Sequence, residues 1–216
     1  MKIKILFINV LLLLFSSISF AQNMSWEELL KRTQRPLIEP IRDEATGLYG
    51  YQNTKTGKII VPCKYQFALT FSEGLGAVNV GGKVRYDAEY AEDYVCTGGL
   101  WGYVDSTGVV VIKPQFTAAD QFSEGFATVE KNKLKALIDK TGKVLCPFIY
   151  EYLFPASEGL CVAAKGKPLR FGFINTEGKE VIDFDYEEAN SFLKGRAQVV
   201  RYGARFYINK EGKRVN

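Results

Sequence analysis

The 216-residue chain contains no histidine, and this absence excludes several classes of function. Ser-His-Asp and Cys-His catalysis both need an imidazole base, and His-ligated metal sites need an imidazole ligand. The four cysteines show no CxxC spacing. The sequence therefore predicts no catalytic residue, no metal ligand and no cofactor-binding residue.

The chain also lacks an apolar run long enough to cross a membrane. Its N-terminal run, residues 5–15, is far short of the ~20 residues that a spanning helix needs. The run follows Lys2 and Lys4 and is followed by small residues up to Ala21, which is the pattern of a cleaved signal peptide. We predict a signal peptide over residues 1–21, cleaved after Ala21, and an exported protein, periplasmic or secreted. No cysteine lies near the cleavage site, so the protein is not expected to be a lipoprotein.

The chain lacks a large excess of positive or negative charge. The formal net charge is +4, and it falls to +2 without Lys2 and Lys4. A nearly balanced chain argues against general nucleic-acid binding. The remaining length of about 195 residues is ample for one domain with a substantial core.

What the sequence does contain is one repeated unit, clearest at residues 101–129. Turn glycines recur at spacings of 51, 34, 36 and 34 residues, and a second glycine follows 17 residues after each of the first four. A period in the thirties indicates an array of small supersecondary units. The turn glycines are Gly57, Gly108, Gly142, Gly178 and Gly212, and the second glycines are Gly74, Gly125, Gly159 and Gly195.

Most turn glycines end a four-residue segment that starts with Asp or Asn, as in Asp105 to Gly108. The first side chain can bond the backbone ahead of it and the glycine can take positive φ, so hairpin turns are predicted. A calcium loop is the alternative, but the dense carboxylates and closing Glu of such loops are missing. The apolar runs after the turns are expected to form buried strands. These runs are residues 59–61, 110–112, 144–146 and 180–182.

Aromatic and small residues recur at fixed offsets and predict the core. Aromatics stand eight residues after the turn glycine and, in most copies, fourteen after it, while small residues stand two after the second glycine. Rings facing small residues describe a packed core, and sugar stacking is the alternative. The three sets are Tyr65, Phe116, Tyr150 and Tyr186; Phe71, Phe122, Ala156 and Phe192; and Gly76, Ala127, Cys161 and Ala197.

Cysteine placement follows the same logic. Cys146 and Cys161 occupy core positions of the repeat, so we predict buried, unpaired thiols there. An exported protein can also form disulfides, and four cysteines allow three pairings. The pairing of Cys63 and Cys96 is left open.

The segment Trp101-Gly102-Tyr103-Val104-Asp105, followed by Thr107-Gly108, resembles the WG-repeat family of bacterial β-repeats. Residues 171–175 and 49–51 are weaker matches, and the resemblance covers about residues 37–216. The third copy departs from the pattern at Lys135-Ala136, and the last departs at Arg205-Phe206. The resemblance implies a β-repeat fold and brings no catalytic residues with it.

We predict an all-β fold of tandem β-hairpin or meander repeats, with a short N-terminal helix over residues 22–36. That helix is expected to cap the array through Trp26, Leu29 and Leu30, and a partner-docking helix is the alternative. Residues 37–42 are expected to form a strand. The strand either caps an open array or completes the last hairpin of a closed, propeller-like ring, and the polar C-terminal end favours the open array. Within a domain spanning 37–216, the units are residues 49–80, 101–130, 135–164 and 171–200, with a partial unit at 205–216.

One hairpin carries an insertion, residues 83–99. Insertions in repeat proteins form loops on one face, often the binding face. Its tyrosines are four residues apart, so either a helical turn or an extended hairpin would place them on one side. A Tyr-rich acidic contact loop and a solvated loop packed on the neighbouring unit are both open interpretations. The candidate contact residues are Tyr86, Asp87, Tyr90, Glu92, Asp93 and Tyr94.

Three further charged clusters have a functional and a structural interpretation. A basic C-terminal end could bind anionic polymers or lipid headgroups, or be a solvated cap. An acidic run at Asp183, Asp185, Glu187 and Glu188 could hold a hydrolase carboxylate pair, although nothing in it supplies burial. The Ser-Glu pairs at 72–73, 123–124 and 157–158 could form an acidic ladder or cap backbone at loop ends. The residues of the basic end are Arg196, Arg201, Arg205, Lys210, Lys213 and Arg214.

The function predicted from the sequence is that of a non-catalytic, exported binding or scaffold protein that acts through the surface of its repeat array. The expected partner is another protein or an envelope polymer, with no cofactor, no nucleic acid and no membrane span. A binder of anionic envelope polymers and a carboxylate-based hydrolase are the alternatives.

Overall fold

The computed structural model describes residues 37–87 and 93–215, which belong to one compact unit, Leu37–Asn216. The predicted signal peptide, the predicted capping helix, Tyr90 and Glu92 lie outside the described residues. The described part of the chain contains twenty strands and no helix. The prediction of an all-β repeat fold is therefore confirmed.

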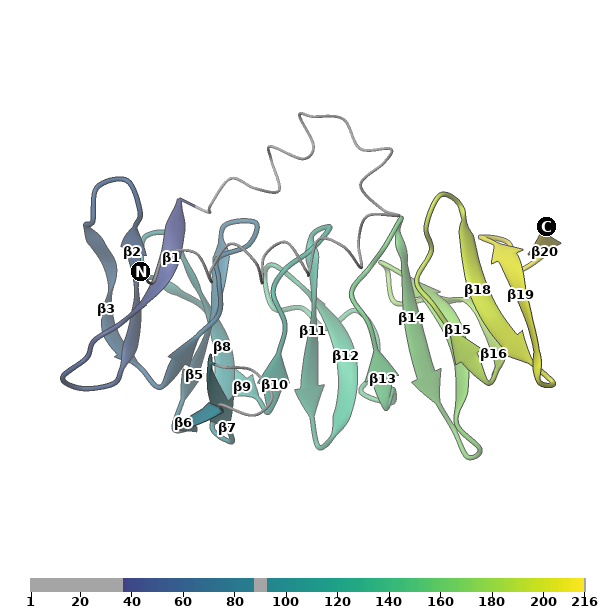
Figure 1. Ribbon diagram of the computed structural model, residues 1–216, viewed down its shortest axis with the longest axis horizontal. Helices are drawn as coiled ribbons and strands as arrows, with labels where there is room; N and C mark the ends of the chain where they lie inside the picture. Colours follow the sequence, from purple (N-terminus) through teal and green to yellow (C-terminus); the bar gives the residue numbers. More distant parts are fainter. Residues whose placement is uncertain (1–36, 88–92, 216) are drawn as a thin grey trace, which may run out of the picture. The chain divides into compact units, whose positions relative to one another are not determined.

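The strands form five sheets that follow one another along a row, plus one separate two-stranded hairpin (Figure 1). All pairing is antiparallel. The sheets of the row are β1 (Ile38–Arg42), β2 (Tyr49–Asn53) and β3 (Ile59–Tyr65); β4 (Phe67–Ala68), β5 (Leu75–Val80), β8 (Leu100–Asp105) and β9 (Val110–Phe116); β10 (Ala118–Ala119), β11 (Phe126–Lys131) and β12 (Leu134–Asp139); β13 (Tyr152–Leu153), β14 (Leu160–Lys165), β15 (Arg170–Asn175) and β16 (Glu180–Tyr186); and β17 (Glu188–Ala189), β18 (Arg196–Arg201), β19 (Ala204–Asn209) and β20 (Arg214–Val215). The separate hairpin is β6 (Lys83–Asp87) with β7 (Asp93–Thr97).

Each inner sheet joins the end of one sequence copy to the start of the next. The last long strand of a copy, such as β14, pairs along its length with the first strand of the following copy, β15. β1 pairs in the same way with β2, so it behaves as the last strand of a preceding unit. β1 and the last hairpin, β19–β20, lie at opposite ends of the row (Figure 1). The array is open, and the alternative of a closed ring is wrong.

The Asp/Asn-x-x-G turns form as predicted. The carboxylate of Asp105 accepts hydrogen bonds from the backbone N–H groups of Thr107 and Val109 and from the Thr107 hydroxyl. Gly108 closes the turn with φ of +89°, a conformation that glycine adopts without steric cost. These hydrogen bonds, that of the Thr107 hydroxyl first, hold the pKa of Asp105 below its usual value. The carboxylate is thus engaged in building the turn.

The glycine of the aromatic-Gly-aromatic motif allows two strands to approach closely. A Cβ on Gly102 would lie 2.4 Å from the carbonyl oxygen of Ile112 and 2.6 Å from the nitrogen of Pro114. The register between β8 and β9 shifts at this point, which is a β-bulge. Gly50 and Gly172 show the same crowding against the backbone of β3 and β16. The motif therefore requires glycine for a packing reason.

The third copy lacks this glycine. Ala136 stands where the first, second and fourth copies have glycine, and the expected strand at residues 144–146 does not form. The prediction of a strand there is wrong. Only isolated bridges remain, Ile138 with Val144 and Lys135 with Tyr150. The Leu137 N–H donates to the Cys146 sulfur at 3.2 Å. In a regular strand pair, this N–H would bond a backbone carbonyl of the neighbouring strand.

The apolar runs after the turns are less buried than expected. In each run one residue is buried, namely Val61, Ile112, Cys146 or Ile182. The preceding residues reach the surface, and Val110 and Val111 are each 41% exposed. β3, β9 and β16 are the last strands of their sheets, so they are covered on one side only. The expectation of buried strands is corrected to edge strands, in which the apolar run inserts one side chain into the core and the aromatic at the end of the strand inserts a second.

The core includes most of the aromatic and small residues that the offsets predict, packed against further rings of the repeat. The ring of Tyr103 meets that of Phe122 edge-on with centroids 4.9 Å apart, and Phe173 and Phe192 repeat the contact at 4.9 Å. In the first copy, a Cβ on Gly76 would lie 2.5 Å from the Phe71 ring. The small residue is therefore needed because a ring packs against it. Phe71 and Ala156 are half-buried, and the other members of the three sets are buried.

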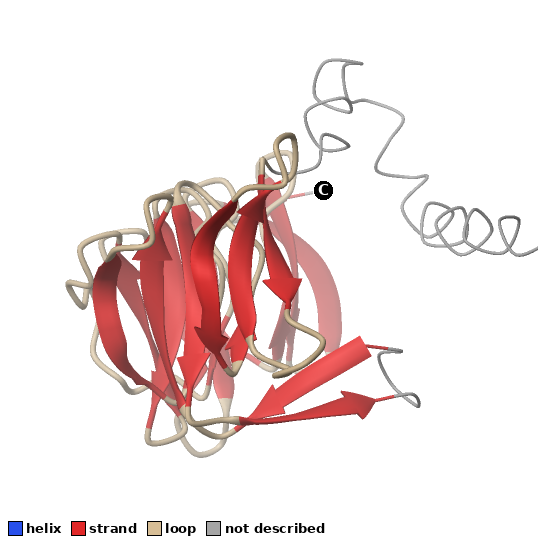
Figure 2. Ribbon diagram, turned by 90° about the vertical axis from the view of Figure 1, so that its left-hand side faces the viewer, coloured by secondary structure: helices blue, strands red, loops and turns tan. Residues whose placement is uncertain are grey.

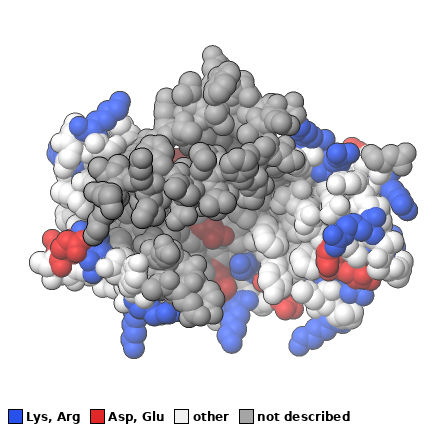
Figure 3. Space-filling view, viewed as in Figure 1, with Lys and Arg blue, Asp and Glu red and all other residues white. Residues whose placement is uncertain are grey.

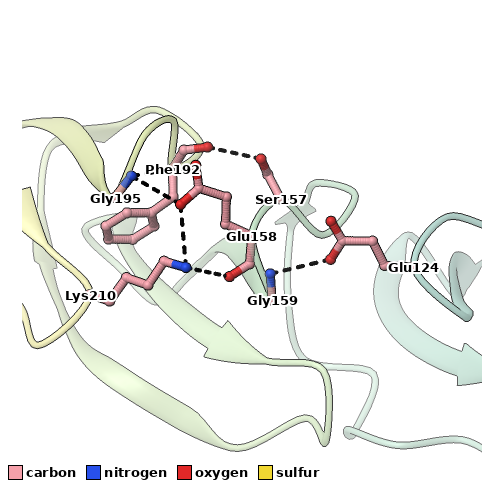
Figure 4. Close-up of polar contacts among 7 residues, drawn as sticks. All are labelled: Glu124, Ser157, Glu158, Gly159, Phe192, Gly195 and Lys210. Carbon is pink, nitrogen blue, oxygen red and sulfur yellow. Dashed lines mark hydrogen bonds and ion pairs between the residues drawn. The ribbon is translucent and has the colours of Figure 1, made fainter. Parts of the chain in front are cut away.

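The Ser-Glu pairs link neighbouring copies (Figure 4). The Glu158 carboxylate accepts the Gly195 N–H of the next copy at 3.0 Å, and the Ser157 hydroxyl donates to the Phe192 carbonyl at 2.8 Å. Glu124 accepts the Gly159 N–H in the same way at 3.2 Å. Backbone capping is thus the role observed, and it acts between copies. Burial would raise the pKa of Glu158, but hydrogen bonds from the Gly195 N–H and from Lys210 hold it below its usual value.

All four cysteines lie in the described residues and carry free thiols. Cys146 and Cys161 are buried in one core cluster, as predicted. Burial raises the pKa of the Cys161 thiol to about 12. Cys63 and Cys96 are half-buried.

Candidate functional site

The insertion forms a hairpin that stands away from the row of sheets, seen at the lower right of Figure 2. β6 and β7 pair in register, with Tyr86 opposite Tyr94. The two rings meet edge-on with centroids 5.5 Å apart. Of the two conformations open from the sequence, the described residues therefore adopt the extended hairpin, which places these tyrosines on one side.

A buried asparagine fixes the base of this hairpin. Asn79, at the end of β5, is fully buried. Its amide nitrogen donates to the Gly98 carbonyl at 3.1 Å, and its amide oxygen accepts the Gly82 N–H at 2.9 Å. One side chain therefore holds both the entry and the exit of the insertion.

The glycines at the base leave room for this contact. A Cβ on Gly82 would lie 2.4 Å from the Asn79 amide oxygen, and a Cβ on Gly99 would lie 2.5 Å from the same atom. Gly81, Gly98 and Gly99 have positive φ, which side chains other than glycine rarely adopt. The Gly-Gly pairs at the two ends of the insertion therefore bring its strands together over Asn79.

The described residues of the hairpin also pack on the array. Val84 contacts the core cluster of the first copy, and Cys96 contacts that of the second. The Arg42 guanidinium, from β1, lies over the Tyr94 ring at 4.6 Å from its centroid. A loop held by a polar clamp, two apolar contacts and a cation–π contact is placed in a defined position on the array.

An apolar cleft of about 380 Å³ lies at the foot of the hairpin. Its lining includes Tyr94, Val95 and Cys96 of β7 together with Phe67, Trp101 and Ala119 from the array. The Phe67 and Trp101 rings meet edge-on with centroids 6.2 Å apart. The rest of the lining consists of Leu69, Gly98, Thr117 and Ala118. Such a cleft, with aromatic side chains and few polar groups, suits an apolar side chain or small apolar ligand.

The structure places the predicted contact residues in three ways. Tyr86 is 56% exposed on the outer part of the hairpin, whereas Tyr94 is half-buried under Arg42 and lines the cleft. Asp87 and Asp93 are the paired end residues of the two strands. Tyr90 and Glu92 lie outside the described residues. Their role as a contact site stays a prediction.

The six cations of the basic end do not form a single-sign patch. Arg201 pairs with Asp185, Arg205 with Glu188 at 2.9 Å, and Lys210 with Glu158 at 3.3 Å. Cations lie against carboxylates at this end of the row, on the right of Figure 3. Arg196 and Arg214 lie over the rings of Tyr207 and Phe206, at 4.7 and 4.9 Å. The Lys213 backbone N–H bonds to Asn209. Much of the positive charge is therefore balanced within the chain.

The acidic run of the fourth copy is similarly engaged. In addition to the Asp185 and Glu188 pairs, the Glu187 carboxylate accepts the Gly203 N–H at 3.1 Å. Asp183 and Asp185 line a small polar pocket of about 260 Å³ together with Arg201 and Glu211. Three of the four carboxylates of the run are therefore engaged in ion pairs or a backbone hydrogen bond, whereas a glycosidase needs two carboxyl groups that face each other across a cleft.

Two negative findings apply to the described ranges only. Among residues 37–87 and 93–215, no group of three or more cysteines, aspartates or glutamates is arranged to hold a metal ion. The same residues include no helix with the length and apolar character needed to span a membrane.

Sequence reasoning missed Asn79 and the cleft. The residue ends an apolar strand, and its only signal was an amide beside the Gly-Gly pair at 81–82. Trp101 was assigned to the repeat motif and Phe67 was not singled out. Their joint position beside the insertion follows from the pairing of β5 with both β4 and β8.

Comparison with known proteins gives one positive finding. A family model described as a WG containing repeat matches residues 49–83, 101–134, 137–167 and 171–203, which together make up more than half of the chain. No curated protein matches the chain significantly.

Proposed function

Because the chain belongs to the family of proteins with WG-containing repeats, we propose that it is a non-catalytic binding or scaffold protein that recognises another protein through the hairpin β6–β7 and the cleft at its foot. The repeat domain supports a binding or scaffold role based on the array. We also propose that the protein is exported, which the signal-peptide pattern of residues 1–21 supports.

The observation that carries this proposal is the cleft itself. A solvated insertion needs no fixed base and no apolar wall. Here Asn79 fixes the base by two hydrogen bonds, and residues of β7 line an apolar cleft together with Trp101 and Phe67 of the array. Aromatic residues in a partly buried depression are the typical anchors of protein interfaces. The ion pairs of the basic end make the envelope-polymer alternative the weaker one.

Partner capture with one cleft variant tests the proposal. Ala118 lines the cleft and is exposed, so Ala118→Arg should fill the cleft without disturbing the core. Ala204→Arg, an exposed alanine of the last copy, is the matched control. Tagged full-length proteins, each confirmed as folded by circular dichroism, would capture partners from envelope and culture fractions.

We expect the parent and Ala204→Arg to capture the same protein and Ala118→Arg to lose it. Equal capture by all three would reject the cleft as the recognition site. Capture that disappears for all three at high salt would instead favour an anionic polymer bound by charge.

A further inference from the structure

A second depression continues the cleft toward the third copy. It has a volume of about 600 Å³ and shares Leu69 with the first. Its other lining residues include Asp120, Phe122 and Pro155. The chain passes directly from Ala119 in the first depression to Asp120 in the second. The two depressions therefore adjoin, and we call them together the hairpin groove.

Among the described residues that line the groove, Asp120 carries the carboxylate. Nothing in the described part of the chain donates a hydrogen bond to the Asp120 side chain or forms an ion pair with it. Its backbone is nevertheless fixed: the Tyr103 hydroxyl donates to its carbonyl at 2.7 Å, and its N–H donates to the Thr128 carbonyl at 2.9 Å. The residue lies at the surface, yet its surroundings exclude enough water to raise the pKa of the carboxyl, and the Lys135 charge only partly opposes this.

Asp120 also departs from the repeat. The equivalent positions, twelve residues after the turn glycine, are Leu69, Phe154 and Asn190. Their N–H groups make the same backbone hydrogen bond, Leu69 to Ala77, Phe154 to Val162 and Asn190 to Gln198. The position thus tolerates apolar residues, and the copies on either side use them. A carboxylate between Leu69 and Pro155 is not required by the fold.

These observations identify the chemistry of the occupant. The β7 end of the groove offers Trp101, Phe67 and Val95 to an apolar side chain. Further along, Leu69 and Pro155 can cover the aliphatic stem of a lysine or arginine while Asp120 meets its charge. An extended peptide segment can present both groups along a groove of this kind.

We propose that the hairpin groove binds an extended segment of a partner protein that carries a large apolar side chain near β7 and a basic side chain at Asp120. This inference rests on the proposed function, because it names the chemistry of the partner segment at the same site. A partner segment that places a carboxylate at Asp120 would be excluded by charge repulsion.

Peptides of one design provide the test. Immobilised peptides with Phe and Arg separated by one to four threonines would be compared with versions in which Arg is replaced by Glu or Phe by Ala. For the full-length parent we expect one spacing to bind best, and Arg→Glu in that peptide to weaken binding at least about tenfold, as for a charged hydrogen bond. Asp120→Asn should abolish the difference between Arg and Glu peptides and keep the difference between Phe and Ala.

Asp120→Leu is a second variant that separates binding from folding. It places the residue of the first copy at the equivalent position, so its thermal stability should equal or exceed that of the parent, while its preference for Arg peptides should be lost. The inference is overturned if the parent binds no spacing of the Phe-Arg peptide, if it binds the Arg and Glu peptides equally, or if Asp120→Asn leaves their difference intact.

Capture of the natural partner by the two variants distinguishes failure of this inference from failure of the proposed function. Loss of capture by Ala118→Arg but not by Asp120→Asn would leave the recognition site in place and reject the basic residue. Retained capture by Ala118→Arg would reject the recognition site itself.

Discussion

Asn79→Ala should release the insertion hairpin from the array. The substitution removes two hydrogen bonds, one from the Asn79 amide to the Gly98 carbonyl at 3.1 Å and one from the Gly82 N–H at 2.9 Å. The rest of β5 keeps its pairing with β8, since that pairing uses backbone atoms. The defect is therefore expected to be local.

The structure sets the size of the effect. Leaving a buried polar group without its partner costs about 1–3 kcal/mol. Gly98 is exposed and Gly82 is half-buried, so water can partly replace the lost amide at both ends. We therefore expect the low end of this range for each bond, or about 2 kcal/mol in all.

Hydrogen exchange and urea unfolding measure the two parts of this effect. Protection of the β6 and β7 amides should fall by more than tenfold in Asn79→Ala, because about 2 kcal/mol of opening free energy is lost. Amides of the distant β14–β15 pair should keep their protection. Partner capture through the hairpin groove should weaken in parallel.

Thr128→Val is the matched control. Thr128 is the other buried polar residue of the core, and its hydroxyl has no hydrogen-bond partner in the described residues. Removing an unbonded buried hydroxyl should be neutral or stabilising. The reasoning is refuted if Asn79→Ala leaves hairpin protection unchanged, or if Thr128→Val destabilises as much as Asn79→Ala does.

Three further predictions concern the array. Gly102→Ala should destabilise the fold by about 3 kcal/mol or more, because its Cβ would lie 2.4 Å from a backbone oxygen. Gly125→Ala should cost roughly 1–2 kcal/mol, because its Cβ meets open space and only the φ of +87° is unfavourable. Equal urea midpoints for the two variants would contradict the close-approach argument. Glu158→Gln should lower stability at neutral pH by less than about 1 kcal/mol. The pKa of Glu158 is lowered in the folded state, so the difference should begin to shrink near the usual value of 4.5 and vanish once the pH has fallen through the lower folded-state pKa; a difference that persists in stronger acid would contradict this. Maleimide at pH 8 should label Cys146 and Cys161 only after unfolding, because both thiols are buried and burial raises their pKa values. Rapid labelling of either thiol in the native protein would contradict this and show that the core opens.

The turns and the core followed from the sequence because both depend on local chemistry. In each of the Asp/Asn-x-x-G turns, the Asp or Asn side chain bonds backbone groups within its own short segment, as Asp105 shows. The fixed offset between Tyr103 and Phe122 reflects a contact within one copy. Such features repeat with the period of the chain, so periodicity reveals them.

Contacts between copies were not predictable in the same way. Glu158 reaches Gly195, 37 residues away, and sequence offsets alone do not show which loops lie side by side in the row. The strand expected at residues 144–146 is missing beside Ala136, and the crowding at Gly50 and Gly102 is a contact between two backbones that the sequence does not display. An asparagine occurs at this position of the repeat in the first copy only, so the repeat pattern does not mark Asn79.

Deletion of residues 83–99 tests the central claim most directly. The deletion removes the hairpin with the β7 residues that line the cleft, and it leaves β5 and β8 to be joined by a tight turn, as β11 and β12 are. The full-length and deleted proteins, both confirmed as folded by circular dichroism, would be used side by side to capture partners from envelope and culture fractions. We predict a partner captured by the full-length protein alone. Equal capture by both would contradict recognition through the hairpin and would place the binding site elsewhere on the array.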